Sequence, residues 1–162
     1  MKRAPAQETA LLTVSSVLER IASVSRVVLS GSSSAPEPLW SLEGKGTVSV
    51  ARNSGSVCLA EEGTYTRSDH SSAFQASWWF SAFASETLRV GHARRGVRAP
   101  LTDLTRCASG EWTSVSPHLC GADAYSVSIV FSEPDSIEMR WRVRGPTKNH
   151  CLRRIYSLKG TL

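Results

Sequence analysis

The feature that most constrains this fold is an alternation of apolar and polar residues, with a period of two, that recurs along most of the chain. The clearest example is the stretch 42–50, where small or apolar residues alternate with Glu43, Lys45, Thr47 and Ser49. Successive side chains of a strand point to opposite faces, so this pattern indicates a strand with one buried face. A helix would instead repeat its apolar residues every three or four positions. The sequence therefore predicts a mostly β protein.

The alternating stretches are short, and residues that favour turns separate them. Turn signals occur at Asn53–Gly55, Ser68–His70, Glu133–Asp135 and Gly145–Asn149, and a longer loop is predicted at 30–38. Besides 42–50, the alternating stretches are 22–28, 57–65, 74–80, 88–92, 112–120, 125–131, 137–143 and 150–156. A meander joined by short turns removes its exposed edges when it closes. We therefore predict an all-β fold, a lipocalin-like up-and-down antiparallel barrel of about eight to ten strands.

A short N-terminal helix is expected in front of the barrel. Residues 7–18 are predicted to form it, because apolar residues recur there and just beyond at helical spacing, namely Leu11, Val14, Leu18 and Ile21. The chain has 162 residues, which suits one domain with its own core. We therefore predict a single domain over the whole chain, with the helix or an extension in 1–18 and the barrel in 19–158.

The sequence argues against a membrane-spanning helix and against a secretory signal peptide. The chain has no apolar run of about 18 residues, which a spanning helix needs. Lys2 and Arg3 resemble the basic start of a signal peptide, but Glu8, Glu19 and Arg20 interrupt the apolar stretch that should follow. We expect an intracellular, cytoplasmic protein, with a mitochondrial presequence as the alternative. Free thiols are then expected at the four cysteines, Cys58, Cys107, Cys120 and Cys151.

The formal net charge is +5, and basic residues cluster in 94–98 and 140–154. These clusters could be a solvated face, or they could attract an acidic ligand, nucleic acid or an anionic membrane. No nucleic-acid motif, Gly-rich phosphate loop or nucleophile elbow occurs in the sequence. The partner we predict is a small anionic or amphipathic ligand, with a protein partner bound to the basic face as the alternative.

Four polar residues are predicted to lie together in the C-terminal third. His118 and Cys120 are two positions apart on a predicted strand and share a face, as do Asp123 and Tyr125. A tight turn between these pairs would bring the four side chains together. Buried polar groups need partners, so such a cluster must be mutually satisfied or bind something.

Three interpretations of this cluster stay open. It could be a structural lock, in which His118 bonds Asp123 or a main-chain carbonyl and Arg26 pairs with Glu61. It could line a pocket, whose predicted ligand-binding residues are Arg26, Glu61, His118, Cys120, Tyr125, Trp141 and Lys148. It could be the site of a barrel isomerase or hydrolase, with His118 as acid or base and Asp123 or Glu61 as its partner.

In the pocket interpretation, an anionic head group would meet Arg26, His118 or Lys148. The body of the ligand would rest on Trp141, Tyr125 and Val48, which are predicted core positions. A metal held by His118 and Cys120, with His92, His150 or Cys151, is a weak alternative because no C-x-x-C or H-x-x-x-H spacing occurs. We therefore predict no metal and no cofactor.

Two segments carry a family resemblance. Residues 118–125 fit H-x-C-x-x-D-x-Y, and residues 141–148 fit W-x-V-x-G-P-x-K. Together they resemble an uncharacterised, mainly bacterial domain-of-unknown-function family with a lipocalin-like barrel, over about Val17 to Leu158. The chain departs from that family's pattern around 92–98, where a segment rich in aromatic residues is barely visible. The resemblance implies the barrel and leaves the chemistry open.

Overall fold

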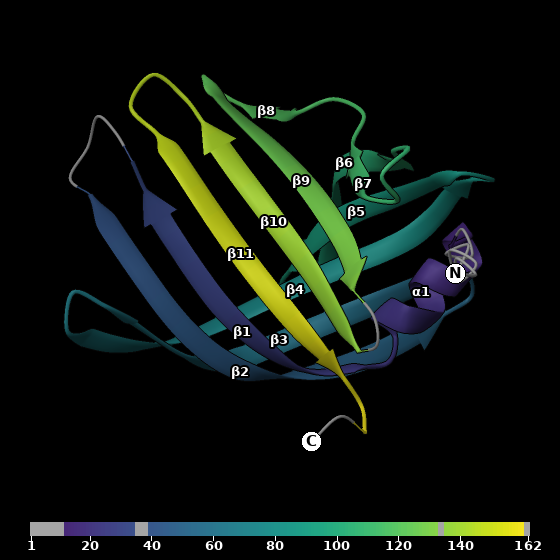
Figure 1. Ribbon diagram of the computed structural model, residues 1–162, viewed down its shortest axis with the longest axis horizontal. Coiled ribbons are helices and arrows are strands. Elements are labelled where there is room, and N and C mark those ends of the chain that lie inside the picture. The colour runs from purple at the N-terminus through teal and green to yellow at the C-terminus, as the bar shows by residue number, and fades with distance from the viewer. Residues whose placement is uncertain (1–11, 35–38, 133–134, 161–162) are drawn as a thin grey trace, which may run out of the picture.

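The computed structural model describes residues 12–34, 39–132 and 135–160, which form one helix and eleven strands (Figure 1). Every pairing between neighbouring strands is antiparallel. The elements are α1 (Val14–Ile21), β1 (Val24–Ser33), β2 (Trp40–Asn53), β3 (Ser56–Arg67), β4 (His70–Ala84), β5 (Thr87–Arg94), β6 (Val97–Arg106), β7 (Trp112–Ser114), β8 (His118–Cys120), β9 (Asp123–Ser132), β10 (Ser136–Arg144) and β11 (Asn149–Leu158).

The sheet closes on itself. Its order is β10-β11-β1-β2-β3-β4-β5-β6-β7-β9-β8, and β9 also pairs with β10. This extra pairing joins the two ends of the sheet, so ten of the described strands form a closed barrel. In the part of the chain that the structure describes, β8 pairs with β9 alone. The predicted all-β, up-and-down barrel with a short helix is confirmed.

Tight turns join several pairs of consecutive strands in the described part of the chain. Ser68 and Asp69 join β3 to β4 with φ of 47° and 66°, and Arg95 and Gly96 join β5 to β6 with φ of 49° and 78°. Positive φ at both central residues is the hairpin turn that matches strand twist. We call the end with these turns the loop end. The opposite end, where α1 lies, is the helix end (Figure 1).

The helix end is filled with apolar side chains. Helix α1 contacts β3 and β4 and buries Val14, Val17, Leu18 and Ile21. A small cavity next to this helix is lined by Ile21, Val24 and six further residues, and its volume is about 10 Å³. That is the limit for one water molecule, so no larger molecule fits there. The helix was predicted over 7–18. In the described residues it begins at Val14, after the N-cap Thr13, and ends at Ile21, and residues 7–11 lie outside the described part.

The loop end of the barrel is more open. Several inward-facing residues there are only partly buried, namely Leu42, Phe74, Tyr125 and Leu152, although Val143 is buried. Inward-facing residues near the helix are almost all fully buried. The barrel interior is therefore packed more completely at the helix end than at the loop end.

The stretch 112–120, predicted as one strand, is two. Strand β7 ends at Ser114 and β8 begins at His118, with Pro117 between them. Proline has no backbone N–H for a sheet ladder, which explains the break. The Ser114 hydroxyl accepts from Val127 N at 2.8 Å and donates to Val127 O at 3.1 Å. A side chain thus replaces the next backbone pair of the β7–β9 ladder.

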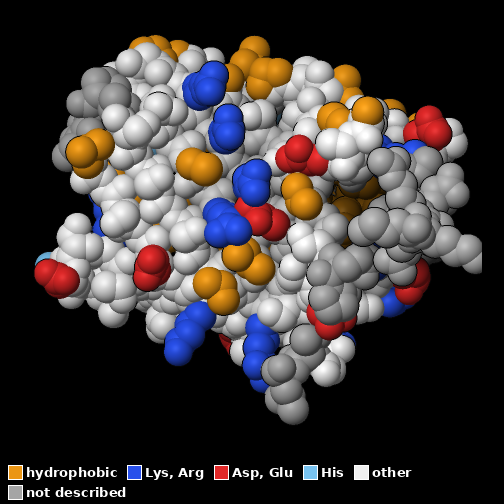
Figure 2. Space-filling model, in the orientation of Figure 1, with side chains coloured by type: hydrophobic (Ala, Val, Ile, Leu, Met, Phe, Trp, Pro, Cys, Tyr) orange, Lys and Arg blue, Asp and Glu red, His pale blue; other side chains and the backbone are white. Residues whose placement is uncertain are grey.

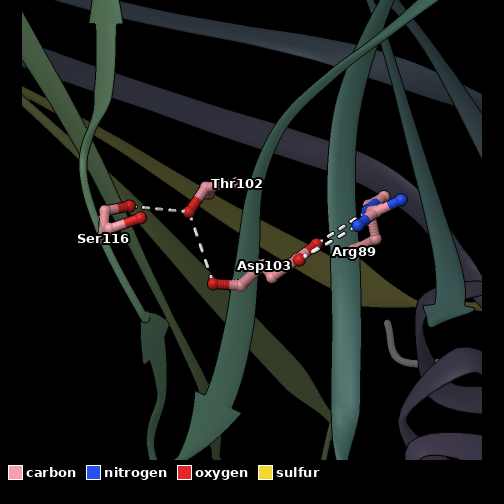
Figure 3. Close-up of polar contacts among 4 residues, drawn as sticks. All are labelled: Arg89, Thr102, Asp103 and Ser116. Carbon is pink, nitrogen blue, oxygen red and sulfur yellow. Dashed lines mark hydrogen bonds and ion pairs between the residues drawn. The ribbon is translucent and has the colours of Figure 1, made fainter. Parts of the chain in front are cut away.

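The connection between β7 and β8 is fastened to β6 instead. Val115 N donates to Asp103 O at 2.9 Å, and the Thr102 hydroxyl donates to Ser116 O at 3.0 Å. Figure 3 shows the second contact beside the ion pair of Asp103 with Arg89, whose Nε donates at 2.7 Å. These bonds hold the wall of the barrel together where β7 has ended.

The alternation predicted for 22–28 is wrong after Val24. A bulge in the β1–β11 pairing lies between Val24 and Arg26 and shifts the alternation of side chains. Val24 and Val27 therefore face the core, whereas Arg26 and Val28 lie exposed on the outer face. A single extra residue moves all later side chains to the other face.

The loop predicted at 30–38 is shorter than expected. Strand β1 continues to Ser33, and residues 35–38 lie outside the described part. Gly31, which suggested a turn, lies within the strand. A Cβ at Gly31 would approach Leu152 Cδ2 to 2.7 Å, so this glycine allows close packing rather than a reversal.

Candidate functional site

A buried carboxylate lies in the middle of the barrel. The Glu61 side chain on β3 has no solvent exposure. Tyr156 Oη donates to its Oε1 at 2.5 Å, and Arg154 Nε donates to its Oε2 at 3.1 Å. A charge can be buried when it is paired and hydrogen-bonded, so these three residues form a satisfied network. Burial, and then the charge of Glu61, raise the pKa of Tyr156 well above its usual range and keep it a donor.

Two tryptophans form the wall next to this network. The rings of Trp78 and Trp141 stack with their centroids 5.3 Å apart and their planes 24° apart. The Arg154 guanidinium lies over Trp78, 4.8 Å from the ring centroid, and the His92 ring is 5.8 Å away. The indole nitrogens of both tryptophans are buried and have no hydrogen-bond partner among the described residues.

The unused hydrogen-bonding groups of this region are mainly donors. Arg154 binds Glu61 through Nε, and neither terminal nitrogen contacts an acceptor in the described part of the chain. Its side chain is 13% exposed. Because Arg154 lies between Leu152 and Tyr156 on the inward face of β11, that exposure is toward the interior. Both oxygens of Glu61 already accept bonds, so the region fits a molecule that brings acceptor oxygens.

The predicted polar cluster lies at the rim of the loop end. His118 pairs with Tyr125 across the β8–β9 hairpin, with ring centroids 6.3 Å apart, and Cys120 pairs with Asp123. The structure therefore brings these four residues together, on one face. Asp123 accepts from Lys148 Nζ at 2.5 Å, and this bond raises the pKa of Lys148. The acidic partner expected for His118 is thus already bound to a lysine.

This ion pair also joins the two segments that carry the family resemblance. Asp123 belongs to 118–125 and Lys148 to 141–148. Gly145 lies directly against the Asp123 carboxylate, and a Cβ at Gly145 would overlap it. Gly145 and Lys148 thus both have a structural role, because they hold the β10–β11 hairpin against the β8–β9 hairpin.

Arg26 does not reach Glu61, so the predicted Arg26–Glu61 pair is wrong. The bulge in β1 turns Arg26 to the outer face, and Arg154 takes its place inside. Sequence reasoning missed Arg154 and Tyr156 as site residues. One feature of the sequence could have indicated this pair. Glu61 and Arg154 are charged residues that each occupy an inward-facing position of an alternating strand.

The further metal ligands that were considered beside His118 and Cys120 are dispersed. His92 lies beside Trp78, the His150 ring lies 5.0 Å from Trp40, and Cys151 lies on the opposite face of β11 from Leu152. Among residues 12–34, 39–132 and 135–160, no three His, Cys, Asp or Glu side chains are grouped to hold a metal ion. The four cysteines are unpaired.

The outer face of β10 and β11 is basic. Figure 2 shows Lys and Arg side chains in a row over these strands. Arg153 Nε and Nη2 donate to the Glu138 carboxylate at 2.6 and 2.7 Å, and Arg140 also binds it. Hydrogen bonds from Arg153 lower the pKa of Glu138 to about 2. Arg142 and Arg144 lie exposed on the same face.

The sequence matches one known protein family. The model of DUF6314, a family of unknown function, matches residues 23–158. The chain belongs to DUF6314. A family of unknown function with this barrel was predicted, whereas the matching of individual motif residues stays a prediction. No curated protein matches the chain.

One solved structure that is similar to this DUF6314 chain, a lyase, shares its fold. An S-type phycobiliprotein lyase, CPES from Guillardia theta, is 11% identical with a TM-score of 0.66, over 98% of this chain and all of the lyase. A de novo designed fluorescence-activating β-barrel is 10% identical with a TM-score of 0.44, over 86% of this chain and 97% of its own. In the described part of the DUF6314 chain, no helix is long and apolar enough to cross a membrane.

Proposed function

We propose that this protein binds a small, partly apolar molecule inside the barrel, with an anionic oxygen group of the ligand at Arg154. One observation carries the proposal. Arg154 lies on the inward face of β11 and is held in place by Glu61 and Trp78, yet its two terminal nitrogens bond no described residue. A fixed guanidinium with free N–H groups suits a carboxylate, which it binds through two parallel hydrogen bonds.

The walls around Arg154 suit the rest of such a ligand. The stacked rings of Trp78 and Trp141 give a flat apolar surface, and their unpaired indole N–H groups add donors. Val48 and the partly exposed Tyr125 belong to the same interior cluster. Binding sites for small molecules are mostly apolar with a few well-placed polar groups, as this one is.

Basic residues at the loop end support entry of an anion. Arg67 lies beside the β3–β4 turn, which contains Asp69, and Arg94 and Arg95 lie at the β5–β6 turn. The arginines outnumber Asp69 at these turns, and an excess of one sign of charge around an opening raises the local concentration of an oppositely charged ligand.

The other predicted roles stay predictions. Lys148 and His118 were proposed as head-group contacts, and Lys148 now has Asp123 as a partner. Acid–base catalysis by His118 with Asp123 or Glu61, and a protein partner on the basic face, are separate hypotheses that no geometry here favours over ligand binding.

The test uses two fluorescent probes that differ in charge. The anionic probe is 1-anilinonaphthalene-8-sulfonate, and N-phenyl-1-naphthylamine has the same rings without the sulfonate. We expect saturable binding of one anionic probe per chain, with energy transfer from tryptophan, and weaker binding of the neutral probe. Arg154→Lys keeps a charge for Glu61 but loses the free fork, so anionic-probe affinity should fall about tenfold.

The control is Arg153→Lys, the neighbouring arginine on the outer face, which should change the affinity less than about twofold. Circular dichroism verifies that both variants are folded. The proposal is wrong if the wild-type protein shows no saturable binding, or if the two variants bind the anionic probe equally well.

A further inference from the structure

The break between β7 and β8 leaves a recess on the outer face of the barrel. Its volume is about 300 Å³. Strand β7 pairs with β9 only as far as Ser114, so the surface beside Ser126 lacks a neighbouring strand. The recess is thus a direct consequence of the interruption near Pro117. Its polar lining includes Thr113, Ser114, Ser126, Ser128, Arg140 and Arg142.

The pairing of strands places arginines next to hydroxyl groups in this recess. Arg140 pairs with Ser128, and Arg142 pairs with Ser126, across β10 and β9. Directly paired residues of an antiparallel sheet point to the same side with their Cβ atoms about 4.5–5.5 Å apart. Two guanidinium groups and two serine hydroxyls therefore border one space.

The charge of the recess is positive overall. Arg142 is exposed and has no acidic partner among the described residues, and Arg140 binds Glu138 only through Nε. Glu111 also lines the recess and opposes the arginines. The charge of Glu138 is shared with Arg153, so positive charges outnumber negative charges at this site.

We propose that this recess binds a tetrahedral oxyanion, the phosphate or sulfate group of a small molecule. Arg142 and the free terminal nitrogens of Arg140 would donate from one side, and Ser126 and Ser128 would donate from the floor. Donors from several directions suit a tetrahedral dianion better than a planar carboxylate. The lining includes no aromatic side chain, so it lacks the stacking surface on which bases of a nucleic acid rest. This site is on the outer face and is independent of the interior site.

The test is a titration of ¹⁵N-labelled protein, followed by amide chemical shifts. The titrants are sodium phosphate, sodium sulfate and, as a planar control, sodium acetate, each at constant ionic strength. We expect saturable shifts for phosphate or sulfate at the amides of Thr113, Ser126 and Ser128, and none for acetate. Saturation by only one of the two ions identifies the ligand's head group.

Two matched variants complete the experiment. Arg142→Gln removes the exposed arginine of the recess and should weaken binding at least about fivefold, whereas Arg144→Gln should change it less than about twofold. Arg144 lies two residues further on the same face of the same strand and does not line the recess. Both side chains are exposed, so the fold should survive. Shifts that do not saturate, an equal response to acetate, or equal losses in both variants would overturn the proposal.

Discussion

Replacing Arg154 with methionine tests the buried network that underlies the proposed site. Methionine keeps the length and much of the apolar stem of arginine but leaves the Glu61 carboxylate without its cation. The Glu61 side chain has no solvent exposure, and among the described residues Tyr156 then remains as its only hydrogen-bond donor. The variant should therefore be less stable at neutral pH, even though Arg154 makes a single hydrogen bond to Glu61.

The magnitude follows from the burial of the pair. Removing one partner of a buried ion pair destabilises a protein by about 3–5 kcal/mol. The side chain of Arg154 is 13% exposed, so water can partly solvate the carboxylate left behind. We therefore expect about 3 kcal/mol, which for a domain of this size lowers the Tm by roughly 6–12 °C.

The double variant Glu61→Leu with Arg154→Met separates the ion pair from simple loss of packing. A well-packed apolar replacement of a buried ion pair is often neutral or stabilising. The double variant should therefore lie within about 1 kcal/mol of the wild type, which implies strong coupling between the two positions. The measurement is equilibrium unfolding in urea, followed by circular dichroism, for the wild type, both single variants and the double variant.

Arg153→Met is the matched control, because Arg153 pairs with Glu138 on the outer face with 46% of its side chain exposed. It should lose no more than about 1 kcal/mol. The reasoning fails if Arg154→Met loses less than Arg153→Met, or if the double variant is as unstable as the single Arg154 variant. Either result would mean that Glu61 does not depend on Arg154.

Three further contacts give predictions. The pKa of Glu138 falls from 4.5 to about 2, so its ionised form stabilises the fold above about pH 4.5 and that stability is lost as the pH falls toward 2. In acid unfolding, the free energy of unfolding of the wild type should fall over this range by about 1–2 kcal/mol more than that of Glu138→Gln. This figure allows for the solvent that screens the partly exposed arginines. A Cβ on Gly91 would overlap the Trp79 indole, so Gly91→Ala should lose about 1–3 kcal/mol in urea unfolding; an unchanged midpoint would contradict this packing. Lys148→Met breaks the pair with Asp123, whose partners are 42% and 17% exposed, and should lose less than about 1 kcal/mol while amide exchange speeds up at the rim.

The rim cluster illustrates how far spacing alone carries a prediction. His118, Cys120, Asp123 and Tyr125 lie together because two positions along a strand restore the same face, and a tight turn folds one pair onto the other. The partner of Asp123 was not predictable in this way. Lys148 lies 25 positions further along the chain, in the β10–β11 turn, and the register that places Arg144 opposite Ala124 brings it to 2.5 Å from Asp123.

The interior site illustrates the opposite case. Both Glu61 and Arg154 occupy inward positions of alternating strands, so each one singly is visible in the sequence. Their contact spans 93 positions of the chain and depends on the order of strands between β11 and β3. Arg26 was the expected partner of Glu61, but the bulge after Val24 turns Arg26 to the outer face, and Arg154 binds Glu61 instead. One extra residue in a strand moves each later side chain to the opposite face.

The sequence by itself determined the period-two strands, most of the turns, the antiparallel barrel and the apolar faces, because these depend on neighbours within a few positions. The tertiary structure decided where strands bulge or break, which inward charges meet, and which half of the interior is filled. Those features depend on contacts between distant strands and on where α1 packs. The local alternation of apolar and polar residues does not predict either of these.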